Sequence, residues 1–289
     1  MKKLVIMLLA ALVFIPLHSM AQKEGKGDVI DKVQYRVTYK TQAVEDTTRR
    51  DSAGNYIYKD DDMRLDIGSK VSKFYSGRKA EFYKWMSQAL ERGNMIDMRK
   101  FTGARPKIAW TVYRNYPQGE TSFLDIAYMN NYRISEKTVT PDWSIDSDTC
   151  TILGYHCTKA ETDFKGRHWT VWYTDDIPLD YGPWKLIGLP GLILKAEDSQ
   201  RQFTFVAEGL EQIGGKEDIT LIEGYKKYEP VTQKQFDEVN RNTTVADTMF
   251  KGSEMTVKTQ DKDGHELTAS ETRQKYNKSL PYNPIEIVE

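Results

Sequence analysis

Residues 155–173 read YHCTKAETDFKGRHWTVWY, and this stretch predicts the fold. Tyr155–Thr162 and His168–Tyr173 are rich in the β-branched and aromatic residues that strands favour. The connection between them, Phe164–Arg167, is short and contains a glycine. A connection of this kind joins strands that pair in antiparallel fashion, so the stretch predicts a β-hairpin.

More strands lie on either side of this hairpin. Leu192–Ala196 and Phe203–Ala207 predict a second hairpin, with residues 197–200 at its tip. Apolar and polar residues alternate over Val33–Tyr39 and Met63–Ile67, which is the period of a half-buried strand. The polar residues between these two stretches, which end in Asp60–Asp62, predict a solvated loop. Strand composition returns at residues 71–75, 108–113, 123–128 and 132–140.

Three segments predict helices. Apolar residues recur every three or four positions between Lys79 and Arg92, and Gly93 ends the pattern. Thr232 is a suitable N-cap for a helix over Gln233–Arg241. Thr268 has the same place before a helix over Ala269–Tyr276.

The fold class is therefore mainly β with minor α. We expect a single curved antiparallel sheet, shaped as a half-barrel or bowl, with a few peripheral helices over one mouth or edge. No internal repeat and no linker divides the chain, which predicts one domain over residues 33–289. Residues 22–32 are polar and predict a disordered leader.

The first 21 residues have the pattern of a cleavable signal peptide. Lys2 and Lys3 precede an apolar run over Leu4–Leu17, and Ser19-Met20-Ala21 supplies small residues where a signal peptidase cuts. The run has 14 residues, fewer than the roughly 20 that span a bilayer. We expect an exported protein, in the periplasm or on the outer surface of a Gram-negative bacterium, that does not span the membrane after cleavage.

The block from Trp172 to Asp198 carries a resemblance to a known family. It contains Gly188-Leu189-Pro190-Gly191-Leu192-Ile193, and the chain resembles the GLPGLI family of exported Bacteroidota proteins named after this hexapeptide. Residues 72–76, 153–160 and 282–286 also match its pattern. The resemblance implies an exported β-rich protein of unassigned function and supplies no catalytic residues. More distantly, the chain is similar to the bowl-shaped N-terminal domain of one type of peptide N-glycanase, and in strand pattern to periplasmic lipoprotein carriers.

The hexapeptide itself predicts a tight corner. Pro190 has a fixed φ and Gly191 accepts a positive φ, so Leu189–Leu192 predicts a type II turn before a core strand. Gly188 allows a close approach of the backbone to a neighbour. The alternative interpretation is a rigid rim around a ligand cavity, with Trp172, Tyr181 and Trp184 facing inward.

Cys150 and Cys157 are the two cysteines of the chain. A pair so close in sequence in an exported protein predicts a disulfide, with two buried reduced thiols as the alternative.

Motifs for catalysis and metal binding are absent from the sequence. No Gly-x-Ser-x-Gly elbow or phosphate-binding loop occurs, and His156 and Cys157, as strand neighbours, point to opposite faces. His156 and His168 could face each other across the first hairpin, but we expect neither a metal nor a cofactor.

Asp175, Asp176 and Asp180 leave a carbohydrate-active hydrolase open as an alternative. The formal net charge is −1 without a basic stripe, which gives no sign of nucleic-acid binding.

Aromatic residues gather within residues 169–184, and they are the candidate ligand-binding residues: Trp169, Trp172, Tyr173, Tyr181 and Trp184. By alternation, Trp169 and Tyr173 share one face of the sheet and Trp172 lies on the other. An exposed set could bind an apolar or glycan ligand. The leading hypothesis is a non-enzymatic protein that binds a ligand or an outer-membrane partner; the alternatives are a hydrolase and a structural interaction protein.

Overall fold

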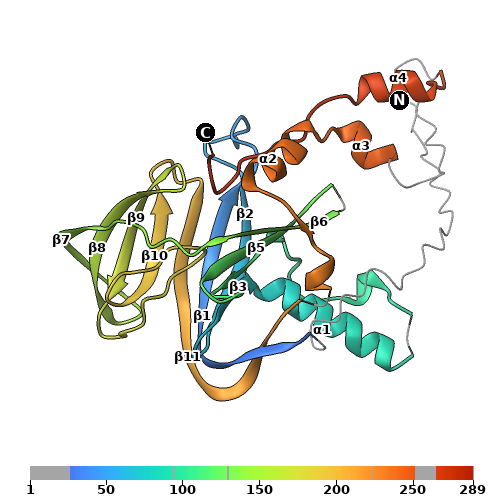
Figure 1. Ribbon diagram of the computed structural model, residues 1–289. Coiled ribbons are helices and arrows are strands. Elements are labelled where there is room, and N and C mark those ends of the chain that lie inside the picture. Colours follow the sequence, from blue (N-terminus) through green and yellow to red (C-terminus); the bar gives the residue numbers. More distant parts are fainter. Residues whose placement is uncertain (1–26, 94, 129, 223, 251–264, 289) are drawn as a thin grey trace.

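The computed structural model describes residues 27–93, 95–128, 130–222, 224–250 and 265–288, and its centre is one curved open sheet (Figure 1). The sheet has twelve strands in the order β12-β6-β5-β4-β3-β2-β1-β11-β10-β9-β8-β7. Neighbours pair in antiparallel fashion except β12 and β6. The predicted fold class, a mainly β chain with a single curved sheet and few helices, is confirmed.

The sheet consists of two meanders. The first meander is formed by β1 (Val29–Val44), β2 (Tyr58–Ile67), β3 (Ser72–Ser76), β4 (Thr111–Arg114), β5 (Glu120–Ala127) and β6 (Asn130–Lys137). The second is formed by β7 (Ser144–Ile152), β8 (Tyr155–Phe164), β9 (Arg167–Thr174), β10 (Leu192–Asp198) and β11 (Phe203–Thr220). The short β12 (Glu229–Pro230) adds to the edge strand β6. The pairing of β1 with β11 joins the two meanders into one sheet.

Both predicted hairpins are present. Phe164 lies directly opposite Arg167 in the β8–β9 ladder, so the turn is only Lys165-Gly166. Both residues have positive φ, 53° and 74°, which is typical of the two-residue turn that matches strand twist. The second hairpin joins β10 to β11, and β10 continues to Asp198, inside the predicted tip.

The helices lie at the periphery. They are α1 (Gly77–Glu91), α2 (Gln233–Asn242), α3 (Val245–Phe250) and α4 (Ala269–Lys275), with 3-10 turns η2 (Met98–Lys100) and η3 (Tyr225–Lys227). The predicted caps are confirmed: Thr232 and Thr268 each form a reciprocal capping box with the residue three positions on. Phe236 of α2 packs edge-on against Phe123 and Tyr132, which places α2 over β5 and β6.

The predicted loop at Asp60–Asp62 is wrong, because these residues lie within β2. Asp61 is fully buried and accepts hydrogen bonds from Ser76 Oγ and from the backbone N–H groups of Lys107 and Ile108. Arg78, at the start of α1, bonds to Asp60 and Asp62. The acidic run therefore fastens α1 and the segment before β4 to the sheet.

The N-terminal predictions lie mostly outside the described residues. The signal peptide, residues 1–21, and residues 22–26 of the predicted leader are not described. Within the rest of the predicted leader, β1 begins at Val29 and pairs with Thr220. No helix in the described part of the chain is long and apolar enough to cross a membrane.

Candidate ligand groove at the mouth of the sheet

A groove of about 510 Å³ opens at the end of the sheet where β1 and β5 finish and β2 and β11 begin. Its roof is the end of α2 together with residues 280–283 of the C-terminal tail. Figure 1 shows α2 and the tail above this end of the sheet. The volume is within the range of small-molecule sites. We call this space the mouth groove.

Apolar side chains form much of the wall of the mouth groove. They are Val44, Ile108, Trp110, Phe203, Leu280 and Pro281. Trp110 is held between two rings, with centroid distances of 5.7 Å to Phe74 and 5.8 Å to Phe123. These contacts fix the wall before any ligand arrives, which reduces the entropy lost on binding.

Most polar side chains of the mouth groove are already bonded to the protein. Asn283 Nδ2 donates to the Val44 carbonyl at 2.8 Å, and Tyr282 Oη donates to Asp237 Oδ1 at 2.6 Å. Lys59 is paired with Glu45 at 2.6 Å. Satisfied groups of this kind shape a site but offer little to a ligand.

Asp125 differs from these residues. It lies on the same face of β5 as Phe123, so its side chain faces the mouth groove. Its carboxylate accepts one hydrogen bond, from the Ile126 N–H at 2.7 Å, and forms no ion pair with any residue that the structure describes. Burial raises the pKa of Asp125 to about 6, against the opposing effects of the Ile126 N–H and the positive charges of Lys79 and Lys59.

The pKa of Asp125 predicts a pH dependence of stability. Since the folded-state pKa is raised above its ordinary value of 3.8, the folded state binds more protons, and stability falls as pH rises through about 6. A pK unit is about 1.4 kcal/mol. Because the side chain still touches solvent in the groove, we expect Asp125→Asn to add only about 1–2 kcal/mol at about pH 7, and close to nothing at about pH 4.

Denaturant unfolding of both proteins across this pH range measures the difference. Asp148→Asn, which removes an acid that is 71% exposed, is the matched control. It should leave the dependence of the unfolding free energy on pH unchanged. If the difference in unfolding free energy between Asp125→Asn and the unmodified chain stayed constant with pH, Asp125 would not be the group whose raised pKa lowers stability.

The tail that roofs the mouth groove is anchored by Arg167. Its side chain is 4% exposed and uses all five N–H donors. The acceptors are Ile285 O at 3.1 Å, Asp198 Oδ2 at 3.0 Å, Gln202 Oε1 at 3.1 Å, Asn283 Oδ1 at 2.9 Å and Pro284 O at 2.5 Å. Three of the five belong to the tail, so this one guanidinium sets the position of Asn283 and its neighbours.

The predicted aromatic residues are mainly core residues. Trp169 is fully buried, and Trp184 and Tyr173 are 3% and 7% exposed, so these three do not form an open ligand surface. The ring centre of Trp169 lies 5.4 Å from that of Trp184 and 6.2 Å from that of Phe205, with the rings tilted against each other. Trp172 lies on the other face, as predicted, with Lys195 Nζ 4.2 Å from its ring centre.

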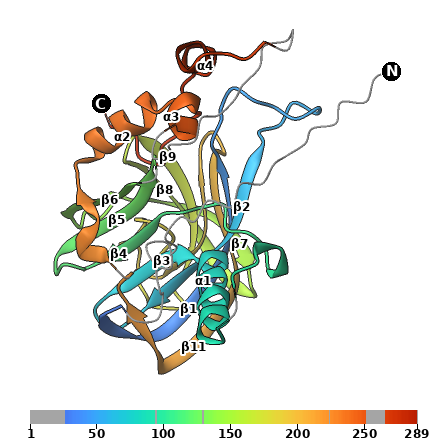
Figure 2. The ribbon, with the colours of Figure 1, turned by 90° about the vertical axis from the view of Figure 1, so that its right-hand side faces the viewer.

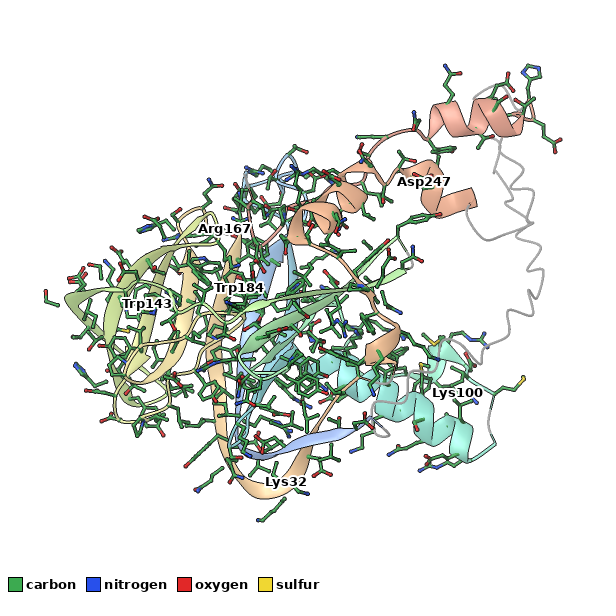
Figure 3. All side chains as sticks on the ribbon, in the orientation of Figure 1. Lys32, Lys100, Trp143, Arg167, Trp184 and Asp247 are labelled. Atoms are coloured by element: carbon green, nitrogen blue, oxygen red, sulfur yellow. The ribbon has the colours of Figure 1, made fainter. Side chains whose placement is uncertain are left out.

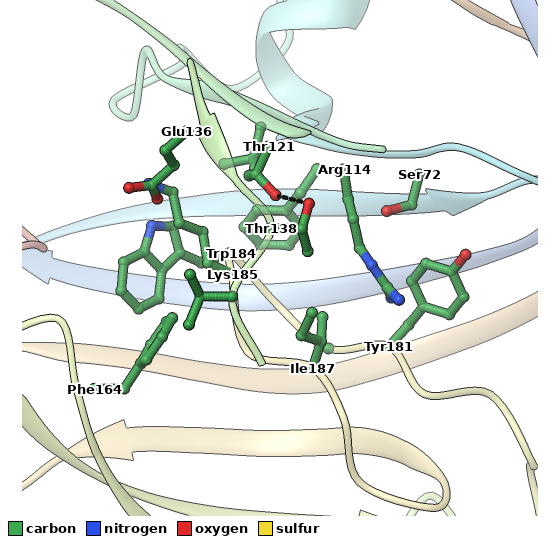
Figure 4. A pocket seen from close by; sticks show the side chains of 14 residues that line it. Ser72, Arg114, Thr121, Glu136, Thr138, Phe164, Tyr181, Trp184, Lys185 and Ile187 are labelled. Atoms are coloured by element: carbon green, nitrogen blue, oxygen red, sulfur yellow. Dashed lines mark hydrogen bonds and ion pairs between the residues drawn. The ribbon is translucent and has the colours of Figure 1, made fainter. Parts of the chain in front are cut away.

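Tyr181 and Trp184 do line a second space, drawn in Figure 4. This space has a volume of about 10 Å³, which is room for one water molecule and too little for a sugar or an acyl chain. The indole Nε1–H of Trp184 is buried and has no partner among the described residues, and one water would satisfy it. The aromatic cluster is therefore a core with a water-sized gap.

The hexapeptide forms a tight corner, but not the predicted turn. The positive φ, 90°, is at Gly188, and Gly191 is not among the residues with positive φ. A Cβ on Gly188 would lie 2.1 Å from Thr140 Cγ2, and one on Gly191 would lie 1.9 Å from the Thr174 carbonyl oxygen. Leu192 and Ile193 then enter the core as the start of β10. The corner therefore positions the start of the core strand β10, and it does not line the mouth groove.

Cys150 and Cys157 are free thiols in this structure, which therefore does not show the predicted disulfide. The two residues are nevertheless directly opposite each other in the β7–β8 ladder. Their short spacing is explained by the two-residue turn Leu153-Gly154 that joins these strands.

The histidines and the loop carboxylates do not form a site. His156 is opposite Thr151, whereas His168 is opposite Asp163 and bonded to it at 2.8 Å, so the two histidines do not face each other. Asp180 is paired with Arg114. No group of three potential metal ligands occurs in the described residues.

Comparisons with known proteins found a family match and similar solved structures. Residues 120–235 match the family described as "N-glycanase peptide, N-terminal domain". Two solved structures, of PNGF-II in the P21 and C2 space groups, each align with a TM-score of 0.43 and 16% identity over 71% of this chain. The aligned part is 32% of those chains, so this chain spans about a third of their length. No curated protein matches the sequence.

Proposed function

We propose that this protein is an exported, non-enzymatic binding protein of the bacterial envelope, and that the mouth groove takes a glycan with partly apolar faces. The observation that carries the proposal is the position of Asp125. Its half-buried carboxylate lies beside the apolar wall of the mouth groove and forms no ion pair with the described residues. Such a carboxylate accepts hydrogen bonds from hydroxyl groups, while an aromatic wall covers the C–H faces of a sugar ring.

The matched family supports a glycan as the ligand. The matching residues, 120–235, include Asp125 and most of the sheet, and the family is described as a domain of an N-glycanase. The signal-peptide pattern of residues 1–21 supports export, and the block from Trp172 to Asp198 supports membership of the GLPGLI family. A purely structural protein, by contrast, would need no groove of this size.

A hydrolase is the second candidate, and the pKa of Asp125 is the observation in its favour. A carboxyl group with a pKa of about 6 can act as a general acid. Glycoside hydrolysis by a carboxylate pair needs a second carboxylate beside the bond. Glu45 is the other acid at the mouth groove, and it is bonded to Lys59. Binding therefore fits the geometry better than hydrolysis.

Calorimetric titration of the mature chain with a panel of N-glycans and shorter oligosaccharides tests the proposal. We expect at least one member to bind, and Asp125→Asn to weaken that binding about tenfold, because a charged hydrogen-bond acceptor becomes an amide. Native mass spectrometry of protein from its own cells is the complementary measurement, since a retained ligand appears as added mass.

Three outcomes separate the candidates. Binding without loss of the glycan, sensitive to Asp125→Asn, supports the proposal. Release of a sugar product that stops in Asp125→Asn would replace it with the hydrolase. Binding that is unchanged in Asp125→Asn, or no binding across the panel and a bare native mass, would contradict the mouth groove as a glycan site.

A further inference from the structure

Residues 77–107 are called the arm here, and its described part, residues 77–93 and 95–107, projects from the sheet. They comprise α1, η2 and the connecting segments before β4. Figure 1 shows α1 extending away from the strands, and Figure 2 looks at it from that side, next to β3. Gly77, Lys79 and Met86 are the buried residues of α1, so most of the helix is at least partly exposed.

Aromatic side chains form a cluster on the arm that is separate from the core. The ring centres of Phe82, Trp85 and Phe101 lie 5.0–6.0 Å apart. None of these rings belongs to the core clusters of the described residues. The Arg105 guanidinium lies 5.0 Å from the Phe101 ring centre and 5.4 Å from that of Phe82.

Long apolar side chains continue outward from this cluster. Leu90, Met95 and Met98 are 40%, 93% and 45% exposed. Met95 also lines a groove of about 520 Å³, whose other lining residues include Trp85, Ala89, Arg92, Asp97 and Lys100. Exposed apolar side chains gathered at one protruding end mark an interaction surface rather than a fold requirement.

The arm is also basic. It has eight Lys and Arg residues against three Asp and Glu residues, in a chain with a formal net charge of −1. At its root, Arg78 and Lys107 are neutralised by the acidic run of β2. Farther out, Lys84, Arg92 and Lys100 are exposed, and no ion pair joins them to any residue in the described ranges. Figure 3 shows Lys100 in this outer part.

We propose that the arm docks on the surface of an anionic phospholipid bilayer. Its apolar end would enter the boundary between headgroups and acyl chains, and Arg92 and Lys100 would meet lipid phosphates. Cations beside Trp, Leu and Met at one protruding end match such a surface in both charge and polarity. This contact is peripheral. Lys107 at the base of the arm lines the mouth groove, but Arg92 and Lys100 do not, so the two proposals can fail independently.

Co-sedimentation of the mature chain with vesicles tests the proposal. We expect the protein to sediment with phosphatidylcholine vesicles that contain phosphatidylglycerol, and to stay in solution with phosphatidylcholine alone or at high salt. Arg92→Glu/Lys100→Glu should reduce the bound fraction by about tenfold or more. Lys137→Glu/Lys234→Glu, which reverses two exposed lysines outside the arm, is the matched control and should bind like the unmodified chain.

A second measurement reports the apolar contact. Brominated acyl chains should quench part of the tryptophan fluorescence, and Trp85→Phe should remove this quenching, because Trp85 is the tryptophan of the arm. Sedimentation that is absent, or that persists in Arg92→Glu/Lys100→Glu, would overturn the proposal. Binding of soluble acidic proteins instead of vesicles would overturn it as well. Unchanged circular dichroism of each variant confirms that the fold is retained.

Discussion

Replacing Arg167 with alanine is expected to lower the free energy of unfolding by roughly 3–5 kcal/mol, the usual cost of removing one partner from a buried ion pair. The change leaves the carboxylate of Asp198, which is 2% exposed, without its cation. It also removes the donors for the carbonyl groups of Pro284 and Ile285. Because the tail roofs the mouth groove, ligand binding should weaken in the fraction of Arg167→Ala that still folds.

Chemical denaturation measures this loss, with two comparisons. Arg167→Lys keeps the charge but has only three donors, so we expect an intermediate loss. Arg99→Ala removes a guanidinium that is 90% exposed and paired with Asp97, and should lower stability far less, because solvent screens an exposed pair. Equal stabilities of Arg167→Ala and Arg99→Ala would show that the buried contacts contribute nothing.

Trp169→Ala should cost about 3–5 kcal/mol as well, because it empties a fully buried position between Trp184 and Phe205. Trp172→Ala, three residues away in the same strand, is the matched comparison. Trp172 lies on the opposite face and is only partly buried. Its loss removes the contact with Lys195, which is worth about 0.5–1 kcal/mol at such a site, and a partial packing contact with the core, so we expect a smaller loss than for Trp169→Ala.

The melting temperatures of the two tryptophan variants decide between a core role and a ligand role for the aromatic residues. A large decrease for Trp169→Ala and a small one for Trp172→Ala would confirm the packing described above. Similar melting temperatures, together with loss of ligand binding in Trp169→Ala, would contradict it and would restore the original hypothesis of an aromatic ligand surface.

Local signals predicted the hairpins and helix starts well. Two-residue turns with a glycine, as at Lys165-Gly166, fix the pairing of the flanking strands without reference to the rest of the chain. Thr232 and Thr268 act through partners three residues away. Such features can be read from a short window because their energetics are local.

Other features depended on distant partners. The sequence prediction missed β7, because an edge strand of composition SIDSDTCTI is mostly exposed and shows no apolar alternation. Asp60–Asp62 resembled a solvated loop because the groups that satisfy them, on Arg78 and Lys107, lie elsewhere in the chain. For Trp169 and Trp172, alternation along the strand predicted correctly that they lie on opposite faces of the sheet. It could not predict which of the two faces the rest of the chain would cover.

The candidate groove residues were also missed, although one signal was present. Asp125 is a single acid within the apolar strand sequence FLDIA, at a position whose strand neighbours on the same face are Phe123 and Ala127. Burying a charge costs free energy unless the charge has a partner or a function. An acid at this inward position was therefore a sign of a functional residue that the sequence already contained. The mouth groove itself could not be predicted, since its wall comes from seven separate segments of the chain.

The junction of the two meanders has a consequence for how the chain is made. β1 pairs with β2 at once, but its other edge is completed only by β11, which begins at Phe203. During synthesis, or in a chain cut short before Phe203, β1 would present a long edge with unused backbone donors and acceptors. Edges of this kind recruit strands from other molecules. The protein is therefore exposed to aggregation until its last long strand is complete, and holding the unfinished chain apart from its copies would be a requirement of its biogenesis.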